Sequence, residues 1–143
     1  MDIEDTTDIL LLIENKIHIH FDGKILTIEL LEECLSDGDV LIMYKVLDNF
    51  YNNCEKNNIF FYILYDFTNL SISSSSSLIY NSSVHHDHLN KHILVFRSHL
   101  QNLFVIIQNS TLRSSLDTIL DTYKPEIKPI LIETIEDIDK HIL

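Results

Sequence analysis

The segment IFFYILY, residues 59–65, constrains the fold most, because it has no polar alternation along its length. A strand with one face in water alternates apolar and polar residues, whereas a strand covered on both faces reads as a continuous apolar run. The run is far too short to cross a membrane. The sequence therefore predicts a central strand with other elements packed on both of its faces.

The segments that flank this strand have the apolar spacing of buried helices. SDGD, residues 36–39, is typical of a helix start, because aspartate accepts hydrogen bonds from the free amides of a first turn. That helix should end near Asn57 and Asn58. Its apolar stripe consists of Val40, Met43, Tyr44, Leu47, Phe50, Tyr51 and Cys54. A second helix is expected to begin in the serine run after the strand, with Ile79, Leu89, Ile93, Phe96 and Leu100 along one side.

The N-terminal segment predicts an antiparallel meander. Residues 8–14 form the first strand, and residues 16–21 alternate, with Ile17 and Ile19 on the face opposite the histidines. Asp22-Gly23 then predicts a hairpin, and residues 24–30 form a third strand. In this register Leu26 lies opposite Ile19, and Ile28 lies opposite Ile17. The alternative takes Gly23 as a bend and starts a short helix at Thr27.

The C-terminal half repeats the alternation of strand and helix. LFVII, residues 103–107, is a buried strand, and Asn109 or Ser110 caps a helix that Pro125 ends. ILIE, residues 130–133, is the last strand, and Thr134 with Asp137 resembles a capping box for a final short helix. The pattern predicts an α/β layered fold with a mixed sheet, parallel central strands and about four helices. We expect residues 1–143 to form one domain with a flexible N-terminus over residues 1–7.

Charge and composition exclude several classes of function. The formal net charge is −12, which repels phosphate backbones and anionic lipid headgroups, so nucleic-acid binding is not expected. Membrane insertion is not expected either, because the longest apolar runs are too short to span a membrane. The acidic N-terminus is unlike a signal or transit peptide, and a cytoplasmic location follows as the expectation. Cys34 and Cys54 lack metal or disulfide spacing and are interpreted as reduced, inert thiols.

No catalytic or cofactor motif is present in the sequence. The two glycines, Gly23 and Gly38, are too few for a dinucleotide fingerprint or a P-loop, and there is no GxSxG motif. We therefore expect a protein that is not an enzyme and that needs no cofactor. A partner protein with a basic or mixed surface fits the acidic charge, and the exposed edge of the first hairpin also allows a homodimer.

One histidine cluster, VHHDHLNKH at residues 84–92, bears on metal binding. On a helix His85, His88 and His92 share one face, with His99 one heptad further along, and three such imidazoles could hold zinc. The alternative is a polar flank beside the apolar stripe of the same helix. We favour the flank, because the cluster lacks the second, distant ligand set of a typical zinc motif.

Taken together, these elements resemble the STAS domain, the small α/β fold of bacterial anti-sigma-factor antagonists, and the related SpoIIAA-like group. IHIHFDGKIL looks like the early strand and Gly-containing turn of that family, and ILYDFTNLSISSSSSL looks like its strand, Asp and following loop. LFVIIQNSTLRSSLDTIL and ILIETIEDIDKHI match its later strand and helix units. The resemblance covers nearly the whole chain.

The resemblance implies a regulatory role for the serine run. Aligning Leu70 and Leu78 on the leucines of the family motif places Ser75 at its regulatory, phosphorylated position, with Ser76 beside it. Ser74 and Ser77 stand where the family has Asp and Gly. The simpler interpretation is a helix cap in a permissive loop.

Two functions remain as the main hypotheses at this point, beside a weaker third, a metal-dependent enzyme that uses His85, His88 and His92. The first is a non-catalytic, STAS-like protein-interaction module. Its partner surface would be the loop and helix start formed by Ser71, Ser73, Ser74, Ser77 and Leu78, with phosphorylation at Ser75 or Ser76. The second, by analogy with SpoIIAA-like and Sec14-type relatives, is a protein that binds a small, lipid-like apolar ligand. Its cavity would be lined by residues such as Phe60, Phe61, Ile72 and Phe96.

Overall fold

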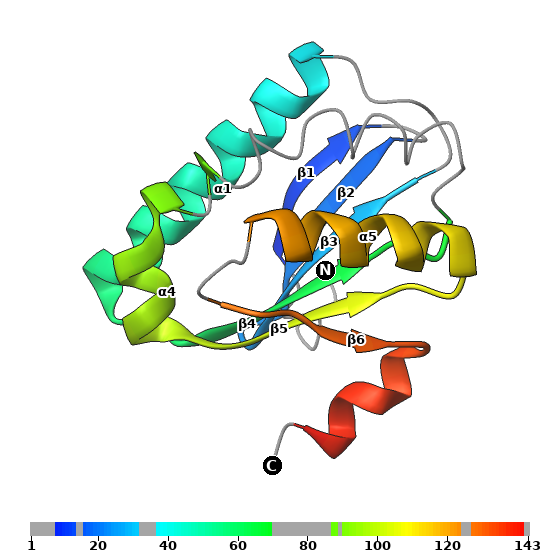
Figure 1. Ribbon diagram of the computed structural model, residues 1–143. Coiled ribbons are helices and arrows are strands. Elements are labelled where there is room, and N and C mark those ends of the chain that lie inside the picture. Colours follow the sequence, from blue (N-terminus) through cyan, green and yellow to red (C-terminus); the bar gives the residue numbers. More distant parts are fainter. Residues whose placement is uncertain are drawn as a thin grey trace, which may run out of the picture.

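A computed structural model describes residues 8–13, 16–31, 37–69, 87–88, 90–123 and 127–141 (Figure 1). The chain begins with three strands and a long helix: β1 (Asp8–Ile13), β2 (Ile17–Phe21), β3 (Ile25–Leu30) and α1 (Asp37–Asn57). It continues with β4 (Phe61–Asp66), α4 (Ile93–His99), β5 (Leu100–Ile106) and α5 (Ser110–Tyr123). It ends with β6 (Ile130–Ile132) and the 3-10 helix η1 (Ile135–Lys140).

The strands form one six-stranded sheet in the order of the chain, β1-β2-β3-β4-β5-β6. β1, β2 and β3 pair antiparallel, and β3, β4, β5 and β6 pair parallel. The predicted mixed sheet with an N-terminal meander and parallel central strands is therefore confirmed. Each parallel step needs a crossover, and α1, α4 and α5 lie in the three crossovers.

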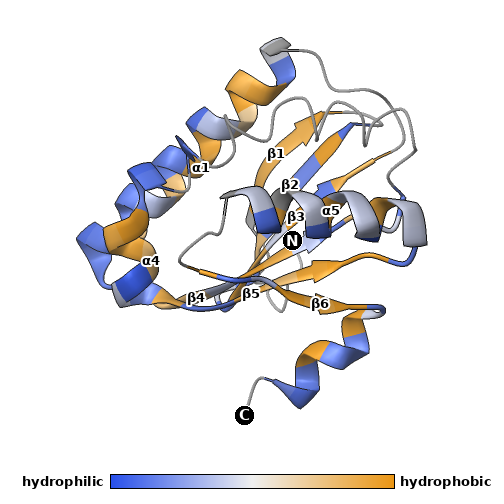
Figure 2. Ribbon diagram, in the orientation of Figure 1, coloured by the Kyte–Doolittle hydropathy of each residue, from blue (hydrophilic) through white to orange (hydrophobic). Residues whose placement is uncertain are grey.

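The two faces of the sheet are covered differently. Buried residues of α1, α4 and α5 pack with one set of strand side chains, which includes Ile28, Phe61 and Val105. The opposite face has a smaller cluster of Leu64, Phe104, Ile106 and Ile132, and η1 contributes Ile138 to it. β4 has buried residues on both faces, which confirms the predicted central strand, but the strand begins at Phe61 and leaves Ile59 and the exposed Phe60 outside it. Figure 2 shows the strands as largely hydrophobic, while the helices carry many hydrophilic positions.

The β2–β3 hairpin is confirmed, but its predicted register is wrong by two residues. Ile28 lies opposite Ile19, and Leu26 lies opposite Phe21. The turn is centred on Gly23-Lys24, because the Asp22 carboxylate accepts hydrogen bonds from the amides of Lys24 and Ile25 at 2.9 and 2.7 Å. Gly23 has a φ of +94°, a conformation that favours glycine, and it occupies the first central position of the turn.

The helix boundaries mostly follow the prediction. α1 ends at Asn57, as expected, and Asn58 has a φ of 55°, so the Ile59 amide reaches back to the Cys54 carbonyl at 2.9 Å. The Asn109 side chain accepts hydrogen bonds from the amides of Thr111 and Leu112 at 2.9 and 3.2 Å, which confirms it as the cap of α5. The capping box of Thr134 and Asp137 also forms, although the helix it starts is 3-10.

The helix predicted to run through Leu100 ends one residue earlier. α4 stops at His99, Leu100 is extended, and it pairs with Phe61 of β4 as the first residue of β5. An apolar side chain at this position fits a helical stripe and a buried strand equally well, and pairing with the central strand determines the outcome. The start of that predicted helix, in the serine run, lies outside the described residues.

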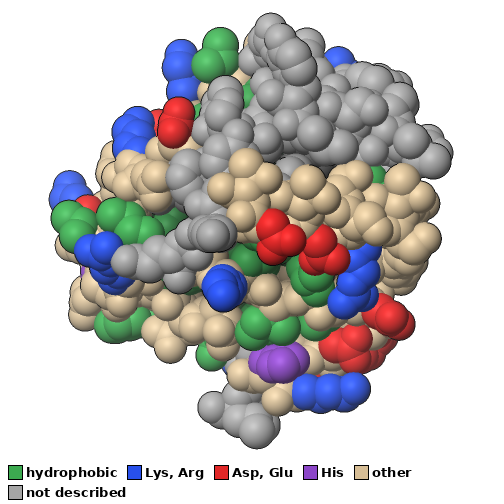
Figure 3. Space-filling view, viewed as in Figure 1, with side chains coloured by type: hydrophobic (Ala, Val, Ile, Leu, Met, Phe, Trp, Pro, Cys, Tyr) green, Lys and Arg blue, Asp and Glu red, His purple; other side chains and the backbone are tan. Residues whose placement is uncertain are grey.

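The edge strand β1 leaves apolar side chains in water. Ile9 is 71% exposed and Leu12 is 62% exposed. The face of the molecule seen in Figure 3 mixes acidic, basic and apolar side chains over its described part. The homodimer expected from an exposed edge stays a prediction, which light scattering of the purified protein would test.

Candidate functional site

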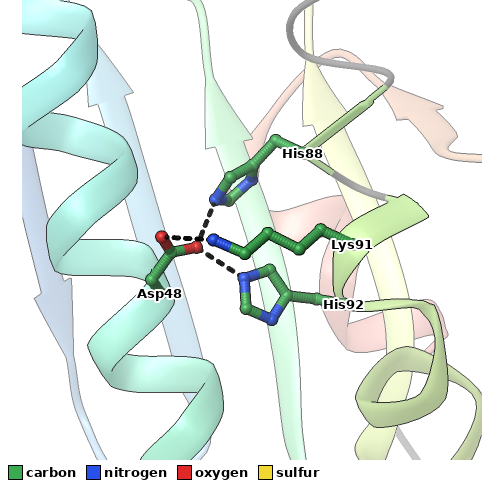
Figure 4. A network of polar contacts seen from close by, with 4 residues as sticks. All are labelled: Asp48, His88, Lys91 and His92. Atoms are coloured by element: carbon green, nitrogen blue, oxygen red, sulfur yellow. Dashed lines mark hydrogen bonds and ion pairs between the residues drawn. The ribbon is translucent and has the colours of Figure 1, made fainter.

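The α1 helix carries an acidic side chain at the border of its buried stripe. Asp48 follows the buried Leu47 and lies one turn from Tyr44 and Tyr51, which are also buried. The Asp48 side chain is 24% exposed, so its carboxylate lies at the boundary between the core and water. α1 packs beside α4, and Figure 4 shows this carboxylate directed at the residues that precede α4.

Three side chains from residues 88–92 converge on this carboxylate (Figure 4). The Nε2 atoms of His88 and His92 lie 2.9 and 2.5 Å from Asp48 Oδ1. Lys91 Nζ donates to the second oxygen, Oδ2, at 3.1 Å. The two histidines are four residues apart, close to one helical turn, and both therefore face α1. The four residues form what we call the Asp48 cluster.

Aromatic rings fix the two imidazoles in place. The His88 ring stacks on Tyr44 with centroids 4.3 Å apart, and the His92 ring lies 4.9 Å from Tyr51. The His88 and His92 side chains are only 9% and 6% exposed. Tyr51 itself is fully buried, and its hydroxyl has no hydrogen-bond partner within the described part of the chain. Packed aromatic rings thus lie on one side of the cluster, and its other side faces water.

The contacts within the cluster determine its protonation. Partial burial alone would raise the pKa of Asp48, but hydrogen bonds from His92, Lys91 and His88 outweigh it and lower the pKa to about 2. Burial lowers the pKa of His88 from its ordinary value, and its hydrogen bond to Asp48 opposes this only in part. At neutral pH Asp48 is therefore ionised and His88 is neutral.

The cluster can do two things chemically. The imidazoles of His88 and His92 can both form hydrogen bonds with the Asp48 carboxylate. Each imidazole donates when its hydrogen is on Nε2. Alternatively, the three residues can each offer one ligand atom to a cation, since the ligand atoms of Asp48, His88 and His92 all lie within 4.8 Å of one another. Either arrangement ties α1 to the segment that enters α4.

The sequence predicted only part of this site. It grouped His85, His88 and His92, and the structure brings His88 and His92 together, while His85 lies outside the described residues. The missed member is Asp48, which supplies the distant ligand whose absence counted against a metal site. Its one sequence signal is an acidic residue directly beside the apolar stripe of α1.

Other described histidines lie outside the Asp48 cluster. The His99 Nε2 lies 3.1 Å from Asn58 Oδ1 and its ring stacks on Phe60, so His99 does not join the Asp48 cluster. His18 pairs with Glu29 at 3.3 Å across the hairpin. His20 is partly buried, and its Nδ1 has no partner within the described residues.

The cysteine prediction can be compared with the structure at one position. Cys54 is free and fully buried in α1, and burial raises its pKa to about 12. A thiol with a raised pKa is a poor nucleophile, which agrees with an inert thiol. Cys34 lies outside the described residues.

The serine run lies outside the described residues, as do all of the predicted partner-surface and phosphorylation positions: Ser71, Ser73, Ser74, Ser75, Ser76, Ser77 and Leu78. The chain reaches them from the carboxyl end of β4. There Asp66 Oδ1 accepts a hydrogen bond from the Thr68 amide at 3.0 Å, and the Phe67 amide donates to the Ile106 carbonyl of β5 at 3.1 Å.

The three described residues suggested for an apolar cavity divide between the packed core and the surface. Phe61 and Phe96 are buried in the packed core, and both contact Tyr51. Their ring centroids lie 5.9 and 5.0 Å from the Tyr51 ring centroid. Phe60 is 51% exposed and stacks on His99. Ile72 lies outside the described residues, so the small-ligand hypothesis stays a prediction.

Comparisons with family models, curated proteins and solved structures found no match to this chain. Among the described residues, none of the helices combines the length and apolar character that a membrane crossing requires.

Proposed function

We propose that this chain is a non-catalytic, STAS-like protein-interaction module whose partner binds the serine segment, residues 71–78. The order of its elements carries the proposal. A Gly-containing hairpin turn at Gly23 is followed by β3, α1 and β4, then by α4 and further strand and helix units. This is the order that the sequence resemblance implies. The sheet in chain order, with α1, α4 and α5 on one face, supports the same interpretation.

The place where the chain enters the serine segment also supports this proposal. Parallel β4 and β5 end side by side, and residues 67–69 continue from the carboxyl end of β4. Loops at the carboxyl ends of parallel strands are common binding surfaces, because a rigid sheet positions them while their backbone stays accessible. A chain with a formal net charge of −12 is complementary to a partner with a basic or mixed surface.

Phosphorylation of Ser75 or Ser76 would regulate this contact. A phosphate adds about 1.5 to 2 negative charges at neutral pH and is stabilised at a helix N-terminus by free amides. On an already acidic protein, the added charge would weaken binding to an acidic patch and strengthen binding to a basic one. Peptide mapping of residues 66–80 from the cells that make the protein would detect the modification.

The test replaces the serines of the segment together. Alanine at Ser71 and at residues 73–77 should abolish recovery of the partner that co-purifies with the wild-type chain, as measured by isotope-labelled mass spectrometry. The control changes the exposed Ser114 of α5, which should leave recovery unchanged. Equal recovery of every partner with and without the serines would contradict the proposed surface, provided circular dichroism shows that both variants are folded.

A further inference from the structure

The Asp48 cluster has the donor set of a transition-metal site. Two imidazole nitrogens and one carboxylate oxygen suit zinc, iron, nickel or copper, whereas calcium and magnesium prefer sites made of oxygen alone. These donors come from two elements far apart in the sequence, α1 and the segment before α4. The cluster thus has both the ligand types and the distant ligand that a histidine run alone lacks.

The distances fit an ion after small movements. In a tetrahedral zinc site with ligand bonds of about 2.0 to 2.1 Å, neighbouring ligand atoms lie about 3.3 Å apart. The Nε2 atoms of His88 and His92 lie 2.9 and 2.5 Å from Asp48 Oδ1. Each contact must therefore open by less than about 1 Å, which side-chain rotation alone can provide.

The ligands are also held in position before an ion arrives. His88 stacks on Tyr44, His92 packs against Tyr51, and both imidazole side chains are less than a tenth exposed. Holding ligands in place reduces the entropy lost on binding.

Lys91 is the one feature of the cluster that opposes a cation. Its ammonium pairs with Asp48 Oδ2 at 3.1 Å, and its side chain is 62% exposed. Because the side chain already extends into water, it can leave the carboxylate at little cost. Its charge should nevertheless weaken binding, and this gives the experiment a variant with increased affinity.

We propose that Asp48, His88 and His92 bind one first-row transition-metal ion, with Zn²⁺ as the expected occupant, through Asp48 Oδ1 and the two Nε2 atoms. Three protein ligands leave at least one position for water or a further ligand. The ion would join α1 to the described residues that lead into α4. This inference needs no partner protein and stands apart from the proposed function.

The test is a titration of the purified, chelator-treated chain with ZnCl2, followed by competition with a chromophoric chelator. We expect one ion per chain with micromolar or tighter affinity. Replacing the ligands in Asp48→Asn or His92→Asn should weaken binding by more than about a hundredfold, which is the upper end of what the loss of an outer-shell partner produces. Lys91→Met should bind about fivefold to tenfold more tightly, because it removes one like charge near the ion.

Three matched variants serve as controls. Asp117→Asn on α5, His18→Asn on β2 and Lys140→Met on η1 make the same chemical changes away from the cluster, and each should bind like the wild type. Co²⁺ titration of the wild-type chain gives a second reading that needs no variant, since ligand-field bands of tetrahedral intensity are expected. Millimolar affinity, absence of those bands, or binding that persists in a folded Asp48→Asn, His92→Asn double variant would overturn the proposal.

Discussion

Replacing Asp48 with asparagine tests how strongly the cluster joins α1 to α4 in the metal-free protein. The change keeps the shape of the side chain but removes its charge. Hydrogen bonds to a charged group contribute about 1.5 to 3 kcal/mol, and those between neutral groups about 0.5 to 1.5 kcal/mol. By this comparison, the hydrogen bond from each of His88 and His92 contributes about 1 kcal/mol less in the variant. The free energy of unfolding should therefore fall by about 2 kcal/mol. Lys91 adds little, because its pair with Asp48 is largely exposed.

The assay is urea unfolding at neutral pH with a chelator present, followed by circular dichroism. The control, Asp117→Asn on the exposed side of α5, should change the free energy of unfolding by less than about 0.5 kcal/mol. A double-mutant cycle of Asp48→Asn with His92→Asn should show coupling of about 1 kcal/mol, since the two side chains contact directly. A loss below about 0.5 kcal/mol, or purely additive effects, would refute the account of the cluster as a link between the helices.

Three further changes have defined outcomes. Tyr51→Phe should raise the free energy of unfolding by about 1 kcal/mol in urea melts, because it removes a buried hydroxyl without a described partner; a loss of stability would mean that the hydroxyl is satisfied. Gly23→Ala should lower it by about 1 kcal/mol, because the φ of +94° disfavours a side chain even though no heavy atom lies within 4 Å of the added Cβ; an unchanged urea midpoint would contradict that. Burial raises the pKa of Cys54 and of Tyr65 to about 12, so these groups ionise first in the unfolded chain, near 9.0 and 10.0. Their contribution to stability is therefore complete below pH 9 and is lost as the pH rises towards 12, and urea midpoints that stay constant from pH 8 to pH 11 would show that linkage to be wrong.

The elements were predictable wherever a periodic pattern had only one interpretation. Ile17 and Ile19 alternate with histidines, and they are the buried face of β2. The register of the next strand was not predictable from the same pattern, because a shift by two residues keeps every side chain on its face. The Asp22 carboxylate determines the register through its hydrogen bonds to the turn amides. Leu100 shows the same limit, since its spacing suits a helix while pairing with Phe61 places it in β5.

The Asp48 cluster was half visible in the sequence for a related reason. His88 and His92 stand close together, so their shared face follows from helical spacing alone. Asp48 lies forty residues earlier, and only the packing of α1 against α4 brings the two segments together. Spacing within one helix gives no information on the partner across a helix–helix contact. The serine segment remains a prediction from resemblance, because it lies outside the described residues.

The proposed partner surface is tested most directly by cross-linking from within it. A photo-reactive amino acid in place of Ser73 should give one discrete adduct in the cells that make the protein, and mass spectrometry would identify the partner. The same group in place of Glu55, on the exposed side of α1, should give no such adduct. An adduct from position 55 alone, or none from position 73 in a folded variant, would contradict a partner surface at the serine segment.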